Sequence, residues 1–237
     1  MIFGLTGLAI EAKEEPSRFS QMSADNAEYA TRYGLLELTG FPKWLPKIFG
    51  LYPRVIQEVV LREISYEMDA PRLESGGNRV LQKLRWGGAW MYEELAAPLM
   101  AWLVQHISDR ESLQLVLSIV QESSVVDEVL AELASKRAIE EVNSEIAPTW
   151  YAVWVGVEPA LAIPALAARI DSLSSDEEKA TYAMLCLIAI VGGRTASRCR
   201  QNYKTVEHAK SLYLLMHTYI RIAEDIDRAG KGVYSPG

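Results

Sequence analysis

The stretch PKWLPKIFGLYP at residues 42–53 reappears as PTWYAVWVGVEP at residues 148–159. Both follow the pattern Pro-x-Trp-x5-Gly-x2-Pro, and the segment after each carries an isoleucine at the matching position, Ile64 or Ile170. Proline suits the first turn of a helix, a large tryptophan anchors it in a core, and glycine is common where a helix ends. The pattern therefore predicts a two-helix hairpin used twice, near residues 42–70 and 148–172. Because proline and glycine are common at helix ends, the five shared identities can also arise by chance.

A hairpin of this kind cannot bury its apolar face alone and has to stack on neighbouring hairpins, as in α-solenoids. Helical periodicity runs through nearly every segment of the chain, whereas alternating strand patterns bounded by Asn-Gly or Asp-Gly turns are absent. We therefore predict an all-α chain of about ten to twelve helices. The expected arrangement is a HEAT- or armadillo-like α-solenoid forming a single helical-repeat domain over residues 1–237. A closed helical bundle is the alternative.

Helix starts and stops can be placed from capping residues and apolar spacing. The spacing Ser124 to Asp127 and Ser175 to Glu178 is that of a capping box. A helix is expected from Pro53 through Met68, and two short buried helices within residues 147–168. The other expected helices are Ala24–Leu38, Val80–Trp86, Trp90–His106, Glu111–Gln121, Val125–Ala134, Arg137–Ile146, Ala180–Val191 and about Val206–Arg228.

Composition restricts the class of protein. The 237 residues are 49% apolar and 23% charged, with a net charge of -7 and two cysteines. These values exclude a disordered chain and a disulfide scaffold, and they argue against a nucleic-acid clamp. The two cysteines, Cys186 and Cys199, form no CxxC motif, and the amino terminus lacks a signal-peptide pattern. We expect a cytoplasmic location, and no membrane span, because Glu158, Pro159 and Pro164 interrupt the longest weakly charged stretch.

The loop from Gly192 to Lys204 is the strongest local candidate for partner contact. It carries Arg194, Arg198, Arg200 and Lys204 in an otherwise acidic chain, and Tyr203 is available to stack. Glycines, exposed amides and arginines together suit an anion or a phosphate backbone. The loop lacks the phosphate-loop motif, and the alternative is a solvated connection between two long helices.

The final expected helix carries a second polar cluster. His217, Arg221 and Glu224 share one helical face, and Asp225 follows, so the cluster could hold a ligand or transfer protons. A solvated face with ordinary ion pairs is the simpler interpretation. No HExxH or similar ligand spacing occurs, and we expect neither a metal nor a cofactor. The aromatic pairs Trp86–Trp90 and Trp150–Trp154 are interpreted as core packing rather than as a ligand groove.

Three stretches resemble a known family. They are ATRYGLLELTGFP at residues 30–42, residues 95–103, and RIAEDIDR at residues 221–228 continuing to the end. They look like the helical-repeat region of large bacterial STAND- or NACHT-type NTPases. The resemblance implies that the chain is a fragment of a longer protein, with the nucleotide-binding module elsewhere and the repeats acting as a sensor or scaffold surface. This sequence contains no NTPase motif, so the resemblance assigns no ATP hydrolysis to it.

Together these observations predict a non-catalytic interaction or sensor scaffold, belonging to a bacterial signalling or defence NTPase. The expected partner is a protein or a neighbouring domain of the same chain, and not a nucleic acid or a membrane. Two alternatives remain: an all-α enzyme with its polar site on the final helix, and an accessory domain that contacts an anion or a nucleic acid.

Overall fold

The computed structural model describes residues 2–69, 79–105, 109–141, 145–192 and 200–220, and within these ranges the chain is helical and has no strand. The all-α fold class is therefore confirmed. The chain divides into two compact units, Met1–Val126 and Asp127–Gly237. The single repeat domain over residues 1–237 stays a prediction, and each of the two related hairpins falls in a different unit.

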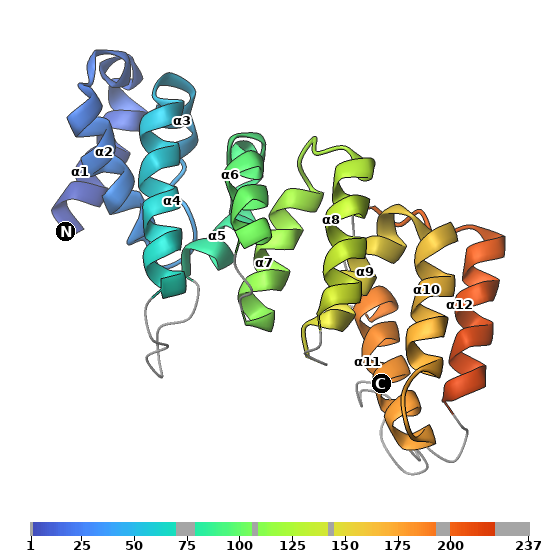
Figure 1. Cartoon of the computed structure of the whole chain (residues 1–237). Helices are drawn as coiled ribbons and strands as arrows, with labels where there is room; N and C mark the ends of the chain where they lie inside the picture. The colour runs from blue at the N-terminus through green and yellow to red at the C-terminus, as the bar shows by residue number, and fades with distance from the viewer. Residues whose placement is uncertain (1, 70–78, 106–108, 142–144, 193–199, 221–237) are drawn as a thin grey trace, which may run out of the picture. The chain divides into compact units, whose positions relative to one another are not determined.

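The first unit is built from α-helices and two short 3₁₀ helices, η1 and η2 (Figure 1). Its core includes α4, whose Ile56, Val60 and Ile64 side chains are buried. These three positions recur at helical spacing, so they form one apolar face. The elements are α1 (Ile2–Glu14), η1 (Pro16–Gln21), α2 (Ala24–Leu35), α3 (Leu45–Leu51), α4 (Pro53–Asp69), α5 (Arg79–Gly87), η2 (Ala89–Met91), α6 (Tyr92–Gln105) and α7 (Arg110–Gln121).

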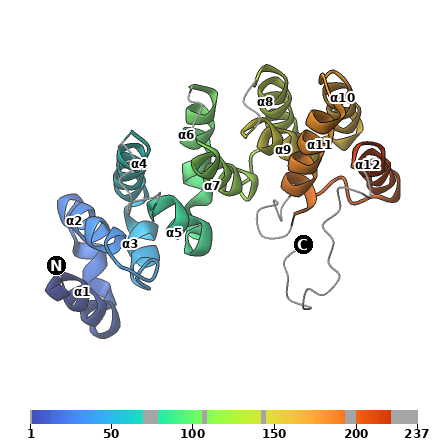
Figure 2. The ribbon, with the colours of Figure 1, turned by 90° about the horizontal axis from the view of Figure 1, so that it is seen from below.

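The second unit is organised around its second helix. Figure 2 shows α8 and α10 in one layer and α9 and α11 in the other. Helix α9 contacts α8, α10 and α11, and its residues from Ala147 to Val157 are buried except Ala152. A helix that is apolar all round is expected at such a central place. The elements are α8 (Asp127–Glu140), α9 (Ala147–Val157), α10 (Pro159–Asp171), α11 (Asp176–Val191) and α12 (Val206–Tyr219).

The two stretches that share the Pro-x-Trp pattern form helix pairs with the same corner. Tyr52, between α3 and α4, has φ -130° and ψ 52°, and Glu158, between α9 and α10, has φ -139° and ψ 64°. Each donates its backbone N–H to the carbonyl four residues earlier. Trp44 and Trp150 are both 3% exposed. The shared sequence pattern therefore encodes a shared local backbone.

The predicted role of glycine in these hairpins is wrong. Gly50 and Gly156 lie inside the last turns of α3 and α9, and neither has a positive φ. The helices continue one residue further and stop because Pro53 and Pro159 start the next helix and supply no N–H for another turn. Gly156 instead packs closely against a later segment, because a Cβ added there would lie 2.5 Å from the carbonyl oxygen of Arg200.

Other expected boundaries also differ from the observed ones. The Ser175 and Glu178 capping box is confirmed at the start of α11. At Ser124 it is wrong, because both the N–H and the hydroxyl of Ser124 donate to the Glu93 carboxylate, and α8 begins at Asp127. Helix α8 is one helix where two were predicted, and α2 ends at Leu35 instead of Leu38.

Two further differences concern the ends of the chain. Helix α1 forms from an apolar segment for which no helix was predicted. Helix α12 ends at Tyr219, since Ile220 is extended, and the remainder of the predicted final helix lies outside the described residues. None of the described helices combines the length and the apolar character that a membrane crossing requires.

Candidate interaction site

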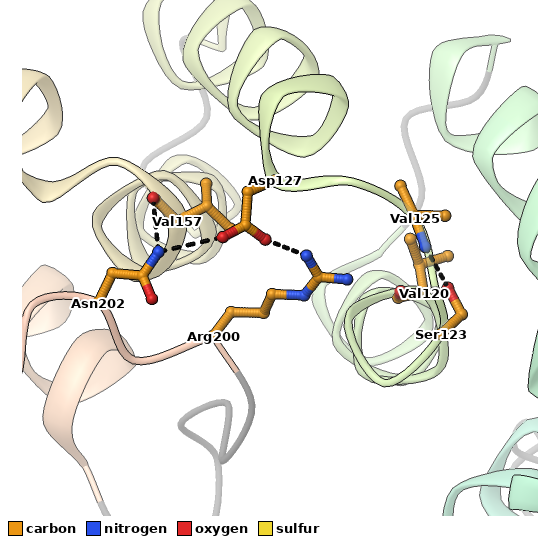
Figure 3. Close-up of polar contacts among 7 residues, drawn as sticks. All are labelled: Val120, Ser123, Val125, Asp127, Val157, Arg200 and Asn202. Atoms are coloured by element: carbon orange, nitrogen blue, oxygen red, sulfur yellow. Dashed lines mark hydrogen bonds and ion pairs between the residues drawn. The ribbon is translucent and has the colours of Figure 1, made fainter.

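Part of the predicted basic loop is tied to its own unit. Arg194 and Arg198 lie outside the described residues. Arg200 has φ 54°, and its guanidinium forms an ion pair with the carboxylate of Asp127, at the start of α8 (Figure 3). The Arg200 side chain is only 15% exposed. The ion pair is therefore shielded from solvent on one side and joins the loop to α8.

Asn202 fastens the same segment to the end of α9. Its side-chain amide donates to Asp127 at 3.1 Å and to the carbonyl of Val157 at 2.9 Å, and its backbone N–H donates to the carbonyl of Gly156 at 2.9 Å. The last carbonyls of a helix have no partner within the helix. Residues 200–204, which we name the clasp, supply those partners for α9.

Tyr203 completes the clasp from the core side. Its ring is 7% exposed, and its hydroxyl donates to the carbonyl of Ile190 in α11 at 3.1 Å. Burial raises the pKa of Tyr203. The prediction that Tyr203 stacks on a partner is wrong, because the ring is already packed. Arg200 is likewise committed to Asp127, and of the predicted contact residues that the structure describes, only Lys204 is exposed.

The predicted cluster of the final helix is described only at His217. The His217 ring is exposed and packs against Tyr213 with ring centroids 4.3 Å apart. Arg221, Glu224 and Asp225 lie outside the described residues, so their joint geometry stays a prediction. Near the end of α12, the Tyr219 hydroxyl donates to Asp171 at 2.7 Å. Burial, together with this hydrogen bond, raises the pKa of Tyr219 to about 12.

The first unit contains a groove that was not predicted from the sequence. It lies between the end of α2, the following loop, α4 and α5, and has a volume of about 1030 Å³. Leu38 is 93% exposed and Trp86 is 81% exposed at its rim, and Leu36 is also exposed. We name it the Trp86 groove. The interpretation of Trp86 as a core residue is wrong, whereas its neighbour Trp90 does pack, against Phe41 and Phe49.

Two half-buried charges hold the walls of the Trp86 groove. The Lys83 ammonium donates to the carbonyl of Leu35, at the end of α2. The Glu67 carboxylate accepts the backbone N–H of Val80 at 3.0 Å, at the start of α5. The Lys83 cation therefore lies at the negative end of the α2 dipole, and the Glu67 anion lies at the positive end of the α5 dipole. Burial lowers the pKa of Lys83 and raises the pKa of Glu67.

This arrangement can hold apolar side chains of a partner. The charged groups of Lys83 and Glu67 form hydrogen bonds with backbone groups, and these bonds link α5 to the end of α2 and to α4. Exposed leucines and a tryptophan beside such walls are the composition of a docking site. Among the described residues, no group of three or more His, Cys, Asp or Glu side chains is placed to hold a metal ion.

The Trp86 groove was not predicted because the end of α2 was expected at Leu38 rather than at Leu35. Leu36 and Leu38 were expected within the last turn of a helix, and Trp86 was interpreted as a core residue in an aromatic pair. The early end of α2 at Leu35 turns the two leucines toward the groove. Comparison of the chain with protein-family models, curated proteins and solved structures finds no match, and the resemblance to STAND-type NTPases stays a prediction.

Proposed function

We propose that this chain is a non-catalytic interaction scaffold that binds a segment of another protein in the Trp86 groove. The observation that carries the proposal is the exposure of Trp86 and Leu38 beside a concave surface. Burying a leucine side chain in an interface contributes about 1.5–3 kcal/mol. Tryptophans are over-represented among the residues that dominate binding energy. The groove thus offers an anchor and a recess for the side chains of a partner.

We further propose that the two related hairpins are units of an α-solenoid. The support is the common corner, with Tyr52 and Glu158 in the same backbone conformation and a buried tryptophan before each. Solenoids present surfaces between stacked hairpins, and their usual task is binding rather than chemistry. This agrees with a sensor or scaffold surface of the kind that the STAND-type resemblance implies.

The clasp reduces the number of residues that an anion-contacting accessory domain could use. Arg200 and Tyr203 serve the second unit itself. A salt-sensitive contact at this loop therefore has to depend on Arg194, Arg198 and Lys204. We keep it as the second candidate function.

Site-specific photo-crosslinking in the producing cells tests the scaffold proposal. A photoreactive residue replaces Thr39, which is exposed at the Trp86 groove, or Ser17, which is exposed on η1 outside it. We expect a discrete protein adduct from position 39 and none from position 17. The substitution Trp86→Ser should remove the adduct, because it removes the anchor while leaving the core intact.

Thermal unfolding provides the control for this experiment. Trp86 is mostly exposed, so Trp86→Ser should leave the unfolding midpoint unchanged. Equal adducts from both positions, no adduct from position 39, or an adduct that survives Trp86→Ser would each contradict binding in this groove.

A further inference from the structure

A second groove is also lined by the loop that follows α2, and it shares Glu37 with the lining of the Trp86 groove. It has a volume of about 570 Å³ and is lined by α1, the loop and the start of α3. Its apolar lining, which we call the floor, includes Leu5 and Ala9 of α1 together with Pro42 and Trp44. Three lysines surround this floor: Lys13, Lys43 and Lys47. We name it the lysine groove.

Within the part of the chain that the structure describes, the three ammonium groups have no protein partner. Three arginines of this unit do form ion pairs: Arg18 with Glu11 and Glu15, and both Arg32 and Arg62 with Glu28. Among the described residues, the side chains of Lys13, Lys43 and Lys47 take part in no ion pair and no hydrogen bond, and all three are exposed. Unpaired cations thus gather at one place in a chain of net charge -7.

Of the described residues that line the lysine groove, one is acidic, and its carboxylate already accepts a hydrogen bond. Glu37 is partly buried, and its carboxylate accepts the backbone N–H of Leu38 at 3.0 Å. It offsets one of the three lysine charges, so the lining keeps a net charge of +2 from its charged members. The groove is therefore locally cationic although the chain is acidic.

We propose that the lysine groove binds an acidic, amphipathic segment of a partner protein. Its carboxylates would face Lys13, Lys43 and Lys47, and its apolar side chains would lie on Leu5, Ala9 and Pro42. Helices or extended segments that insert one apolar face into a groove and pair their charges at the rim are a common recognition mode. Complementary charge at the rim chiefly sets specificity and the rate of association.

A protein segment fits these observations better than an anionic lipid surface. The floor is recessed between elements, so a narrow segment reaches it and a flat bilayer does not. An extended anionic surface would also face much of a chain of net charge -7, whereas a short segment lies within a screening length of about 8 Å mainly of the three lysines. This proposal concerns a different groove from the one in the proposed function. Either binding proposal can be contradicted by its own experiment while the other stands.

Fluorescence anisotropy with the purified full chain tests the proposal. The probe is a labelled amphipathic peptide with glutamates on one helical face and leucines on the other; its glutamine and lysine counterparts are the comparison probes. We expect the acidic peptide to bind, with an affinity that falls as salt is raised, and the other two to bind at least roughly tenfold more weakly.

Matched variants locate the binding. Lys43→Glu with Lys47→Glu should weaken the acidic peptide at least roughly tenfold, since two attractions become repulsions. Lys136→Glu with Lys210→Glu makes the same charge change at exposed lysines of the second unit and should have little effect. Ala9→Trp fills the floor without changing charge and should also abolish binding. Circular dichroism confirms that each variant is folded.

Four results would overturn the proposal. The first two are that the acidic peptide does not bind at millimolar concentration, or that the glutamine peptide binds with the same affinity as the acidic one. The other two are that both charge-reversal variants lose the same affinity for the acidic peptide, or that the Ala9→Trp variant still binds it. Vesicles of phosphatidylglycerol are the competing ligand. Binding to them that depends on Lys43 and Lys47, without binding of the peptide, would assign the groove to a lipid surface instead.

Discussion

Gly156 and Gly50 hold the same position in the two related hairpins, and their surroundings differ. A Cβ added at Gly156 would lie 2.5 Å from the carbonyl oxygen of Arg200, whereas one added at Gly50 would meet open space. Gly156→Ala therefore forces the clasp away from α9 and should lower the free energy of unfolding by about 1–3 kcal/mol. The same change at Gly50 should raise it by up to about 1 kcal/mol, because alanine favours a helix.

Urea unfolding followed by tryptophan fluorescence measures both changes. The opposite signs are the informative result, since the two substitutions are chemically identical. A destabilisation of equal size at both glycines would show that the close contact with Arg200 has no energetic role.

Cys186 illustrates how burial determines reactivity. The thiol is buried in α11, and burial raises its pKa to about 12. Only the thiolate is nucleophilic, so Cys186 should be inert in the folded chain near neutral pH. In a Cys199→Ser background we expect no reaction with Ellman's reagent until denaturant is added, and one equivalent afterwards. Rapid reaction of the native chain would contradict this burial.

Some helix termini in this chain bond to partners that are distant in the sequence. Glu67 of α4 accepts N–H groups at the start of α5, and burial of its carboxylate raises its pKa. In the pH range just above the ordinary glutamate value of 4.5, the folded chain holds this proton while the unfolded chain releases it. Glu67 therefore makes the free energy of unfolding fall as pH rises through that range.

Glu67→Gln removes the titration and keeps an acceptor for Val80. The variant should lose the decrease in stability that Glu67 causes in the pH range just above 4.5. Glu58→Gln, which removes an exposed carboxylate of the same helix, should retain that decrease. Glu67→Ala also removes the hydrogen bonds, and should cost about 0.5–2 kcal/mol, as loss of a helix cap does. Unfolding curves over this range supply the measurement, and parallel profiles for Glu67→Gln and the parent chain would refute the assignment.

The elements that could be predicted are those whose signals are local. The Ser175 and Glu178 capping box lies within four residues, and it formed as expected. Ser124 carried the same signal, but Glu93, distant in sequence, takes its hydrogen bonds. In the same way, α2 ends at Leu35, whose carbonyl accepts a hydrogen bond from Lys83 of α5, and the leucines that follow it in the Trp86 groove are exposed. The site was missed because the partners that shape it come from other helices.

At the scale of the whole molecule, the division at Val126 and Asp127 gives a test of the solenoid. Each unit has its own buried side chains, including α4 in the first and α9 in the second. If the units are separate domains, residues 1–126 and 127–237 expressed alone should each be helical and unfold cooperatively.

In a continuous solenoid, each hairpin instead depends on the interface with its neighbour. Splitting the chain should then lower the free energy of unfolding of the fragments, and mixing them should restore helicity lost on separation. Circular dichroism of each fragment, of their mixture and of the full chain distinguishes the two cases. We expect the second unit to fold alone, because α9 is enclosed by helices of that unit and the clasp closes its end. An unfolded 127–237 fragment would show that its stability comes from stacking on the first unit.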